Sequence, residues 1–409
     1  MTDAKNVPVP SPAPIVMLLG SGETSRELAL AFQRLGASVV AVDRYADAPA
    51  HLVADRALVV KMNDRDALAA VIAKEQPHFV VVESGVVATD ALAVVADGAQ
   101  HAPMVFPTPE ATRLSLDREG LRRLAADELG LPTAPFWFAG SAAELATVAE
   151  HAGFPLTVTP VQGAPGDGVS VLLRAEDVEP AWNRAVAAGH TTHNRVMAET
   201  VVDVDDEVTL LTVRTTGPTG PAVHFCEVIG RRTAEDGTLS TWQPHRLSPA
   251  ALDAAKSIAA RIVNSLGGRG VFGVDLLVRG DEVYFATVRP RPDDTGLLTA
   301  RTQRLSEFEL HARAVLGLSV DTIMVSPGAA EVAYGGADTI TEPADPGEVL
   351  AVLAEALAVA ESDVRLFNRL DESDGRYRLG AALATAPDVT VARDRAQRTS
   401  HVLRKLWQS

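Results

Sequence analysis

The chain has 409 residues, 47% hydrophobic and 22% charged, which is enough for two or three domains with buried cores and excludes a globally disordered protein. Its 53 acidic residues outnumber 37 basic ones, and the net charge of −16 argues against nucleic acid as the main ligand. A single cysteine, Cys226, excludes an internal disulfide and a zinc site of the four-cysteine type. Residues 1–14 are polar and proline-rich without the apolar stretch of a secretory signal, and no apolar run could span a membrane, so we expect a cytoplasmic protein.

The first 110 residues alternate short apolar strands with helical patterns, which predicts a parallel sheet covered by helices on both faces. The strands are expected at residues 15–19, 39–42, 58–60 and 79–82, and the helices at residues 28–35, 67–72 and 90–95. Ligands of such sheets bind at the carboxyl ends of the strands. The loop at Gly20, Asp43 and Glu83 all lie at such ends and are therefore candidate ligand positions.

The loop Gly20-Ser21-Gly22-Glu23-Thr24-Ser25 has three interpretations. It resembles a dinucleotide fingerprint, with Asp43 placed about 20 residues on, where an acid would bind the ribose. Ser25 stands where that fingerprint has glycine or alanine, which weakens this interpretation. A tight strand-to-helix turn and a phosphate pocket for another ligand remain open.

After Asp117 the pattern changes to a helix followed by many strands. The helix is expected at residues 118–129, and the strands at residues 156–161, 169–173, 196–202, 208–213 and 223–229. Ser248 and Pro249 are a good N-cap and first residue for a long helix that ends at Gly267. Strands at residues 271–278 and 283–288 should form a hairpin, and the C-terminal segment should combine strands with one helix at residues 346–358.

Few other residues suggest a site. The ten histidines show no paired-ligand spacing, and His190 and His193 are best explained as solvated loop residues. Cys226 lies in an apolar strand, which favours a buried and inert thiol. The acidic turn at residues 203–206 is better explained as solvated than as a metal site.

Seven segments in one order resemble the formate-dependent glycinamide ribonucleotide (GAR) transformylases of the ATP-grasp superfamily. They are VMLLGSGE at 16–23, AVDRYADAPA at 41–50, DREG at 117–120, EVTLLTV at 207–213, WQP at 242–244, PRPDDTG at 290–296 and LGAALATA at 379–386. The resemblance implies an α/β architecture with a pre-ATP-grasp domain at 15–116, an ATP-grasp domain at 117–325 and a small C-terminal domain at 326–409. It also implies a homodimer.

Such enzymes act in purine biosynthesis. They use Mg-ATP to activate formate as formyl phosphate, which the amine of GAR attacks to give formyl-GAR, ADP and phosphate. The implied partners are therefore formate and a phosphorylated amine, with no nucleic acid and no membrane. By the same resemblance GAR is held by Glu23, Thr24, Glu83, Asp294, Arg369 and Arg378. Arg369 replaces a family lysine, and Tyr377-Arg378 replaces an arginine pair.

On the nucleotide side the resemblance is incomplete. The positions that match are Arg118, Glu199, Val202 and Glu207 for ATP and Asp275 for Mg²⁺. Thr159 and Asp167 stand where the family has lysines at the ATP phosphates, and Thr287 replaces its second Mg²⁺ glutamate. Asp293, where the family has histidine, could add a metal ligand.

These departures leave two hypotheses and a weaker third. The first is a formate-dependent GAR transformylase, or a related carboxylate–amine ligase. The second is an impaired or repurposed homologue with weakened Mg-ATP binding that acts as a ligand-binding or regulatory protein, or as a ligase with another substrate. The third is a nicotinamide-dependent enzyme that uses the Gly20 loop.

Overall fold

The computed structural model describes residues 13–98, 102–162, 168–189, 194–335, 345–367 and 377–407. Its first part is a five-stranded parallel sheet in the order β3-β2-β1-β4-β5. The strands are β1 (Ile15–Leu19), β2 (Ser38–Asp43), β3 (Arg56–Val59), β4 (Phe79–Val82) and β5 (Met104–Phe106), and the helices are α1 (Glu23–Arg34), α2 (Arg65–Glu75), α3 (Thr89–Ala96) and α4 (Pro109–Leu116). The predicted parallel α/β sheet is confirmed.

Alternation along β1 explains why both faces of this sheet are covered. Val16 and Leu18 pack with Leu28 and Phe32 of α1 in one apolar cluster. Met17 and Leu19 point to the opposite face, where residues of α2 and α3 complete a second cluster. Because both faces are buried, the strand is a continuous apolar run.

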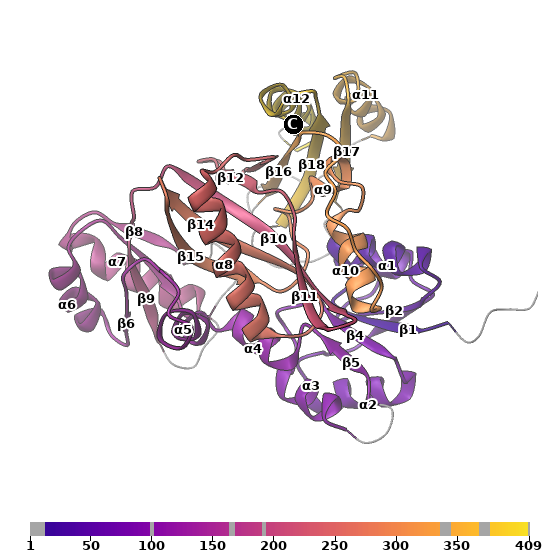
Figure 1. Cartoon of the computed structure of the whole chain (residues 1–409), viewed down its shortest axis with the longest axis horizontal. Helices are drawn as coiled ribbons and strands as arrows, with labels where there is room; N and C mark the ends of the chain where they lie inside the picture. Colours follow the sequence, from indigo (N-terminus) through magenta and orange to yellow (C-terminus); the bar gives the residue numbers. More distant parts are fainter. Residues whose placement is uncertain are drawn as a thin grey trace, which may run out of the picture.

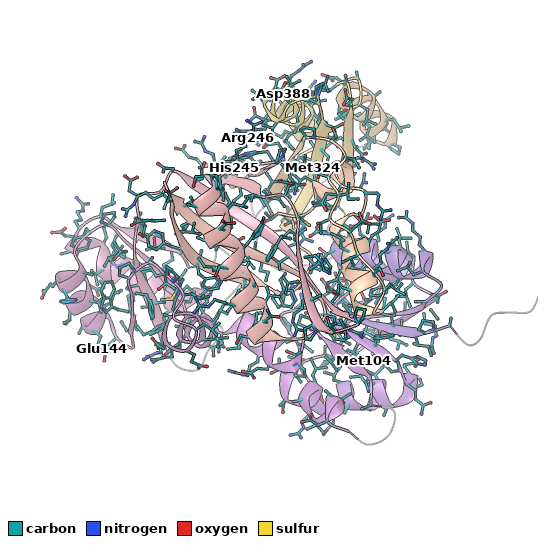
Figure 2. The ribbon with its side chains drawn as sticks, in the orientation of Figure 1. Met104, Glu144, His245, Arg246, Met324 and Asp388 are labelled. Atoms are coloured by element: carbon teal, nitrogen blue, oxygen red, sulfur yellow. The ribbon has the colours of Figure 1, made fainter. Side chains whose placement is uncertain are left out.

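A second, antiparallel sheet of four strands has the order β6-β9-β7-β8. Its strands are β6 (Phe136–Ala139), β7 (Leu156–Pro160), β8 (Ser170–Leu172) and β9 (Val196–Thr200), covered by α6 (Ala142–Ala152) and α7 (Val178–Ala188). Its apolar side chains form a cluster of their own. Figure 1 shows this lobe at one side of the molecule. Figure 2 shows Glu144 of α6 at the lower left and Asp388, the N-cap residue of α12 (Val389–Leu403), at the top.

The largest sheet has nine strands and runs from the middle of the chain into its C-terminal part. Eight strands follow the order β15-β14-β10-β12-β13-β16-β18-β17, and β11 pairs with β10. Their bounds are β10 (Asp206–Gly217), β11 (Gly220–Phe225), β12 (Ile229–Thr233), β13 (Leu239–Gln243), β14 (Gly270–Arg279), β15 (Glu282–Arg289), β16 (Gly328–Gly335), β17 (Ser362–Leu366) and β18 (Tyr377–Thr385). The remaining helices include α5 (Arg118–Arg123), α8 (Pro249–Leu266), α9 (Thr299–Thr302), α10 (Glu307–Val315) and α11 (Pro346–Ala356).

The structure confirms the predicted helix after Ser248, whose hydroxyl accepts a hydrogen bond from the Ala251 N–H at the start of α8. It also confirms the β14–β15 hairpin. The single strand expected at residues 223–229 is wrong, because β11 ends at Phe225 and a new strand, β12, begins at Ile229. The expectation of one C-terminal helix is also wrong, since α12 follows α11 and packs against β16 and β18. None of the helices in the described ranges is long and apolar enough to cross a membrane.

Candidate active site

The Gly20 loop is a tight turn fastened by a carboxylate. Gly20 has a φ of +102°, and a Cβ there would lie 3.0 Å from the backbone nitrogen of Ser84. Asp43, at the end of β2, accepts hydrogen bonds from the N–H of Ser21 at 2.6 Å and from the N–H of Arg44 at 2.7 Å. Both carboxylate oxygens of Asp43 thus bind the backbone, which favours the turn interpretation over a ribose-binding acid.

Four of the residues predicted to hold GAR line one pocket. Its walls come from α1, from the segment between β15 and α10, and from β17 and β18: Glu23, Thr24, Glu27, Asp293, Asp294, Leu297, Phe308, Arg365, Phe367 and Arg378. Arg369 lies outside the described residues. Segments more than 300 residues apart in the sequence therefore supply one site.

Arg378 of β18 joins the walls of this pocket. Its Nε donates to Asp294 at 2.9 Å, and one of its terminal nitrogens donates to the Thr24 hydroxyl at 3.1 Å. Tyr334 of β16 donates its hydroxyl proton to Asp294 at 2.5 Å. The pocket combines a guanidinium group with carboxylates, which suits a ligand that carries both an anionic group and an amine.

Glu83 follows β4, and its Oε1 is buried with no hydrogen-bond partner among the described residues. Burial raises the pKa of Glu83 to about 7, and the nearby Arg291 and Arg378 oppose that rise. A carboxyl group with this pKa can take up or release a proton at neutral pH. Glu83 is not among the residues that line the pocket described above.

Sequence reasoning missed Glu27, Arg365 and Phe367 as pocket residues. Glu27 lies one helical turn after Glu23 on α1, so the helical period could have identified it. Arg365 and Phe367 come from β17 and the residue after it, and no motif marks them.

The predicted nucleotide residues come from several elements around the small lobe. Arg118 begins α5 and donates to the carbonyl of Pro160 at 2.7 Å. Glu199 of β9 pairs with Arg122; burial raises the pKa of Glu199, while Arg122 and Arg118 oppose that rise. Val202 follows β9, and Glu207 lies on β10 with half of its side chain exposed.

Of the three departures on this side, two can be placed. Thr159 lies on β7, where it pairs in register with Met197 of β9. Thr287 lies directly opposite Asp275 across the β14–β15 pair. Asp167 falls outside the described residues.

Asp275 of β14 is enclosed by hydrogen-bond donors. One carboxylate oxygen accepts from the Thr209 hydroxyl at 2.6 Å and from Arg289 at 2.8 Å. The other accepts from Arg289 at 2.7 Å and from Arg231 of β12. Arg289 also donates through Nε to Asp293. We call these five residues the Asp275 network.

The network holds Asp275 ionised although the side chain is buried. Burial alone would raise the pKa of Asp275, but Arg289 and Arg231 outweigh burial and lower the pKa to about 2. A carboxylate has about four acceptor positions, and four hydrogen bonds use all of them.

Comparison with known proteins identifies the family. Residues 15–115 match the ribonucleotide synthetase preATP-grasp domain, residues 124–308 the ATP-grasp domain and residues 349–403 the PurT C-terminal domain. The chain is 49% identical over 391 residues to the formate-dependent phosphoribosylglycinamide formyltransferase of Rhodococcus jostii, with 95% of each chain covered. It is 50% identical over 383 residues to the enzyme of the same name from Corynebacterium efficiens, with 93% of each covered. The chain belongs to the formate-dependent phosphoribosylglycinamide formyltransferase family.

Solved structures agree with this family and its fold. A structure described as glycinamide-RNase-transformylase T from Mycobacterium tuberculosis is 52% identical, with a TM-score of 0.78 and coverage of 95% of this chain and 99% of that one. An N5-carboxyaminoimidazole synthase from Aspergillus clavatus, in complex with ADP and 5-aminoimidazole ribonucleotide, has a TM-score of 0.81 but only 22% identity. It covers 96% of this chain and 99% of its own, and shows a shared fold. The α/β ATP-grasp architecture expected for the formyltransferase family is confirmed.

The formyltransferase family implies Mg²⁺ at Asp275, but the residues present here do not fit that ion. Every acceptor position of Asp275 is already used by Thr209, Arg231 and Arg289. Thr287 opposite is neutral, and Asp293 is bound to Arg289. Two guanidinium groups would also repel a divalent cation. Within the described ranges, no group of three histidine, cysteine, aspartate or glutamate side chains could hold a metal ion.

The other residues considered as possible site residues do not line the pocket, or lie outside the described part of this formyltransferase-family chain. Cys226 is buried and donates to the side-chain oxygen of Gln303 at 3.5 Å, and burial raises its pKa to about 12, as expected for an inert thiol. Asp205 of the acidic turn accepts the N–H of Gly280 at 2.8 Å. His190 and His193 lie outside the described residues.

Proposed function

We propose that this protein is a formate-dependent GAR transformylase that converts ATP, formate and GAR to formyl-GAR, ADP and phosphate in purine biosynthesis. The observation that carries the proposal is the pocket to which Glu23, Thr24, Asp294 and Arg378 converge from distant parts of the chain. The formyltransferase name of the relatives at about 50% identity supports it. The relatives described above give no support to an impaired or repurposed protein.

The reaction has two steps, and neither step needs an oxidant or a reductant. A formate oxygen attacks the γ-phosphorus of ATP and ADP leaves, which gives formyl phosphate. The amine nitrogen of GAR then attacks the formyl carbon, phosphate leaves, and a base takes the amine proton. Glu83, whose pKa burial raises to about 7, is our candidate for holding the amine and accepting that proton.

Charge in the pocket can orient GAR for the second step. Arg378 offers a guanidinium group to the phosphate, with Arg365 beside it as a second cation. Glu23 and Asp294 are carboxylates that can bind the amine end. Arg369 would add a further cation by resemblance. We place ATP beside Arg118, Glu199, Val202 and Glu207, close to the Asp275 network.

Three further features of the proposal rest on resemblance. The domain bounds 15–116, 117–325 and 326–409 are supported by the ranges of the matching domain families. A homodimer and a cytoplasmic location are what the family suggests. Light scattering of the purified protein would measure the assembly.

The test of the reaction is release of ADP by the purified protein, with formate and GAR each present or omitted. We expect ADP release that requires both substrates, together with formyl-GAR detected by mass spectrometry. ADP release that does not depend on GAR, or a product other than formyl-GAR, would contradict the proposal.

A further inference from the structure

Arg231 and Arg289 bring two positive charges to the place where the family implies a metal ion. Both guanidinium groups contact the same carboxylate, that of Asp275, which is only 4% exposed. Thr209, Asp275 and Thr287 are in register across β10, β14 and β15, so they share one face of the sheet. Gly273, opposite Arg289, leaves room on that face, because a Cβ there would lie 3.6 Å from the Arg289 guanidinium.

The two arginines keep donors that the network does not use. A guanidinium group has five N–H donors, and the described contacts of Arg289 use three of them. Arg231 donates to Asp275 through one terminal nitrogen, which leaves its second terminal nitrogen without a hydrogen-bond partner among the described residues, whereas its Nε is buried. Both side chains are partly exposed, 23% for Arg231 and 28% for Arg289. Their remaining donors can therefore reach a ligand.

The Asp275 network lies between the residues predicted to bind ATP and the pocket proposed for GAR. On one side Arg231 is 3.9 Å from Glu207, one of the residues predicted to bind ATP. On the other side Arg289 contacts Asp293, which lines the pocket proposed for GAR. A phosphoryl group that passes from nucleotide to formate must be held near this junction.

We propose that Arg231 and Arg289 take the place of the divalent cation in this chain and bind the phosphate oxygens of the nucleotide directly. Asp275 then acts as a positioning residue for the two guanidinium groups and coordinates no metal. Arginine suits this role because it is always charged and binds phosphate through two parallel hydrogen bonds. The inference rests on the proposed use of ATP, and it adds that nucleotide binding needs no divalent cation.

The test is calorimetric titration of the full-length protein with ATP, in buffer with EDTA and in buffer with excess Mg²⁺. We expect the Kd in EDTA to lie within about threefold of the Kd in Mg²⁺. A Kd that weakens more than about tenfold in EDTA would overturn the inference, because the chain would then need the ion.

Conservative variants test the two arginines themselves. Arg289→Lys and Arg231→Lys keep the charge but lose the paired donors, and each should weaken ATP binding in EDTA about tenfold or more. Arg279→Lys, in an exposed pair with Glu282 at the far end of β14, is the matched control and should bind as the parent does. Equal affinity of all three variants would overturn the inference and show that the network is purely structural. If a variant fails to fold, the ATP Kd of the parent protein in EDTA, compared with its Kd in Mg²⁺, still tests whether binding needs the ion.

The outcomes separate this inference from the proposed function. Binding that requires Mg²⁺, with ADP release that requires formate and GAR, would overturn the inference alone. Binding in EDTA without any formyl-GAR would overturn the proposed reaction alone. No ATP binding in either buffer would overturn both.

Discussion

Asp275 is a buried carboxylate whose neighbours determine what it can bind. The carboxylate is the shape and charge that a metal site needs, yet here its oxygens face two guanidinium groups and a hydroxyl. Removing one partner of a buried ion pair leaves charge without compensation, which costs about 3–5 kcal/mol. The network thus ties the stability of the sheet to the chemistry of the site.

Asp275→Asn should therefore lower the free energy of unfolding by about 3 kcal/mol at neutral pH. Because the folded-state pKa of Asp275 is about 2, below its ordinary 3.8, this stability is present above pH of about 4 and is lost as pH falls towards about 2. The difference between variant and parent in urea unfolding should shrink over that range. Asp394→Asn, an exposed aspartate on α12, is the control and should change stability by less than about 0.5 kcal/mol. A loss below about 1 kcal/mol for Asp275→Asn would contradict the described network.

Glu83 should give GAR binding a pH dependence centred near 7. Burial favours the neutral carboxyl group, and a cationic amine is bound better once Glu83 ionises, so affinity should rise as pH increases through about 7. At about one pH unit below that midpoint, binding should be roughly tenfold weaker than at the plateau. Calorimetry from about pH 5.5 to 8.5 would measure it.

Glu83→Gln isolates this effect, since the phosphate of GAR also titrates near pH 6 and does so in both proteins. The variant should lose the rise near 7 and keep only the phosphate's own titration. Glu110→Gln, on the exposed side of α4, should retain the full profile. An unchanged profile in Glu83→Gln would exclude Glu83 as the group that binds the amine.

At the scale of elements, the strands of the first sheet could be predicted because each is a short apolar run between turn residues. The long strand expected at residues 223–229 failed, since Cys226 and Val228 are buried and apolar although they connect two strands. Burial of a connecting segment is a tertiary effect that local pattern does not show.

Local pattern also determines which site residues could be predicted from the sequence. Glu23 and Glu83 follow strands of a parallel sheet, so their position at its carboxyl edge could be predicted. The contact of Arg231 and Arg289 with Asp275 depends on the register of β12, β10, β14 and β15, which brings both side chains to that carboxylate. No sequence spacing between residues 231, 275 and 289 indicates that contact.

The turn from β1 to α1 can be tested by substitution, because it places Glu23 and Thr24 in the pocket. Gly20→Ser should lower the free energy of unfolding by about 1–3 kcal/mol and weaken GAR binding, since φ is +102° and the new Cβ would meet Ser84. Gly22→Ser is the matched control: it has a φ of −69°, open space, and serine caps helices well. Equal stability of the two variants by urea unfolding would contradict this account of the loop.

On the scale of the whole molecule, the apolar clusters do not follow the division into three domains. One cluster joins Val16 and Phe32 of the first part to Leu211 of β10 and Leu383 of β18. The four-stranded lobe has a separate cluster that includes Leu145, and Figure 1 shows this lobe at one side of the molecule. The four-stranded lobe therefore has an apolar core of its own, whereas one cluster links the first sheet to the large sheet.

Hydrogen exchange measured by mass spectrometry should show this difference. Amides of β6, β7 and β9 should exchange through a lower-energy opening than those of β1, β10 and β18. ATP should slow exchange in the lobe, because Glu199 of β9 belongs to the predicted nucleotide site. Equal protection across all six strands would contradict the division into a shared core and a lobe with a core of its own.

A crystal structure of the ATP or ADP complex grown with Mn²⁺, with anomalous diffraction to locate the ion, would test directly whether the two arginines replace the metal ion. We expect no Mn²⁺ on the Asp275 carboxylate, and phosphate oxygens within hydrogen-bond distance of Arg231 and Arg289. An anomalous peak bound to Asp275, with Arg289 displaced from it, would contradict the assignment of the two arginines to the phosphate site.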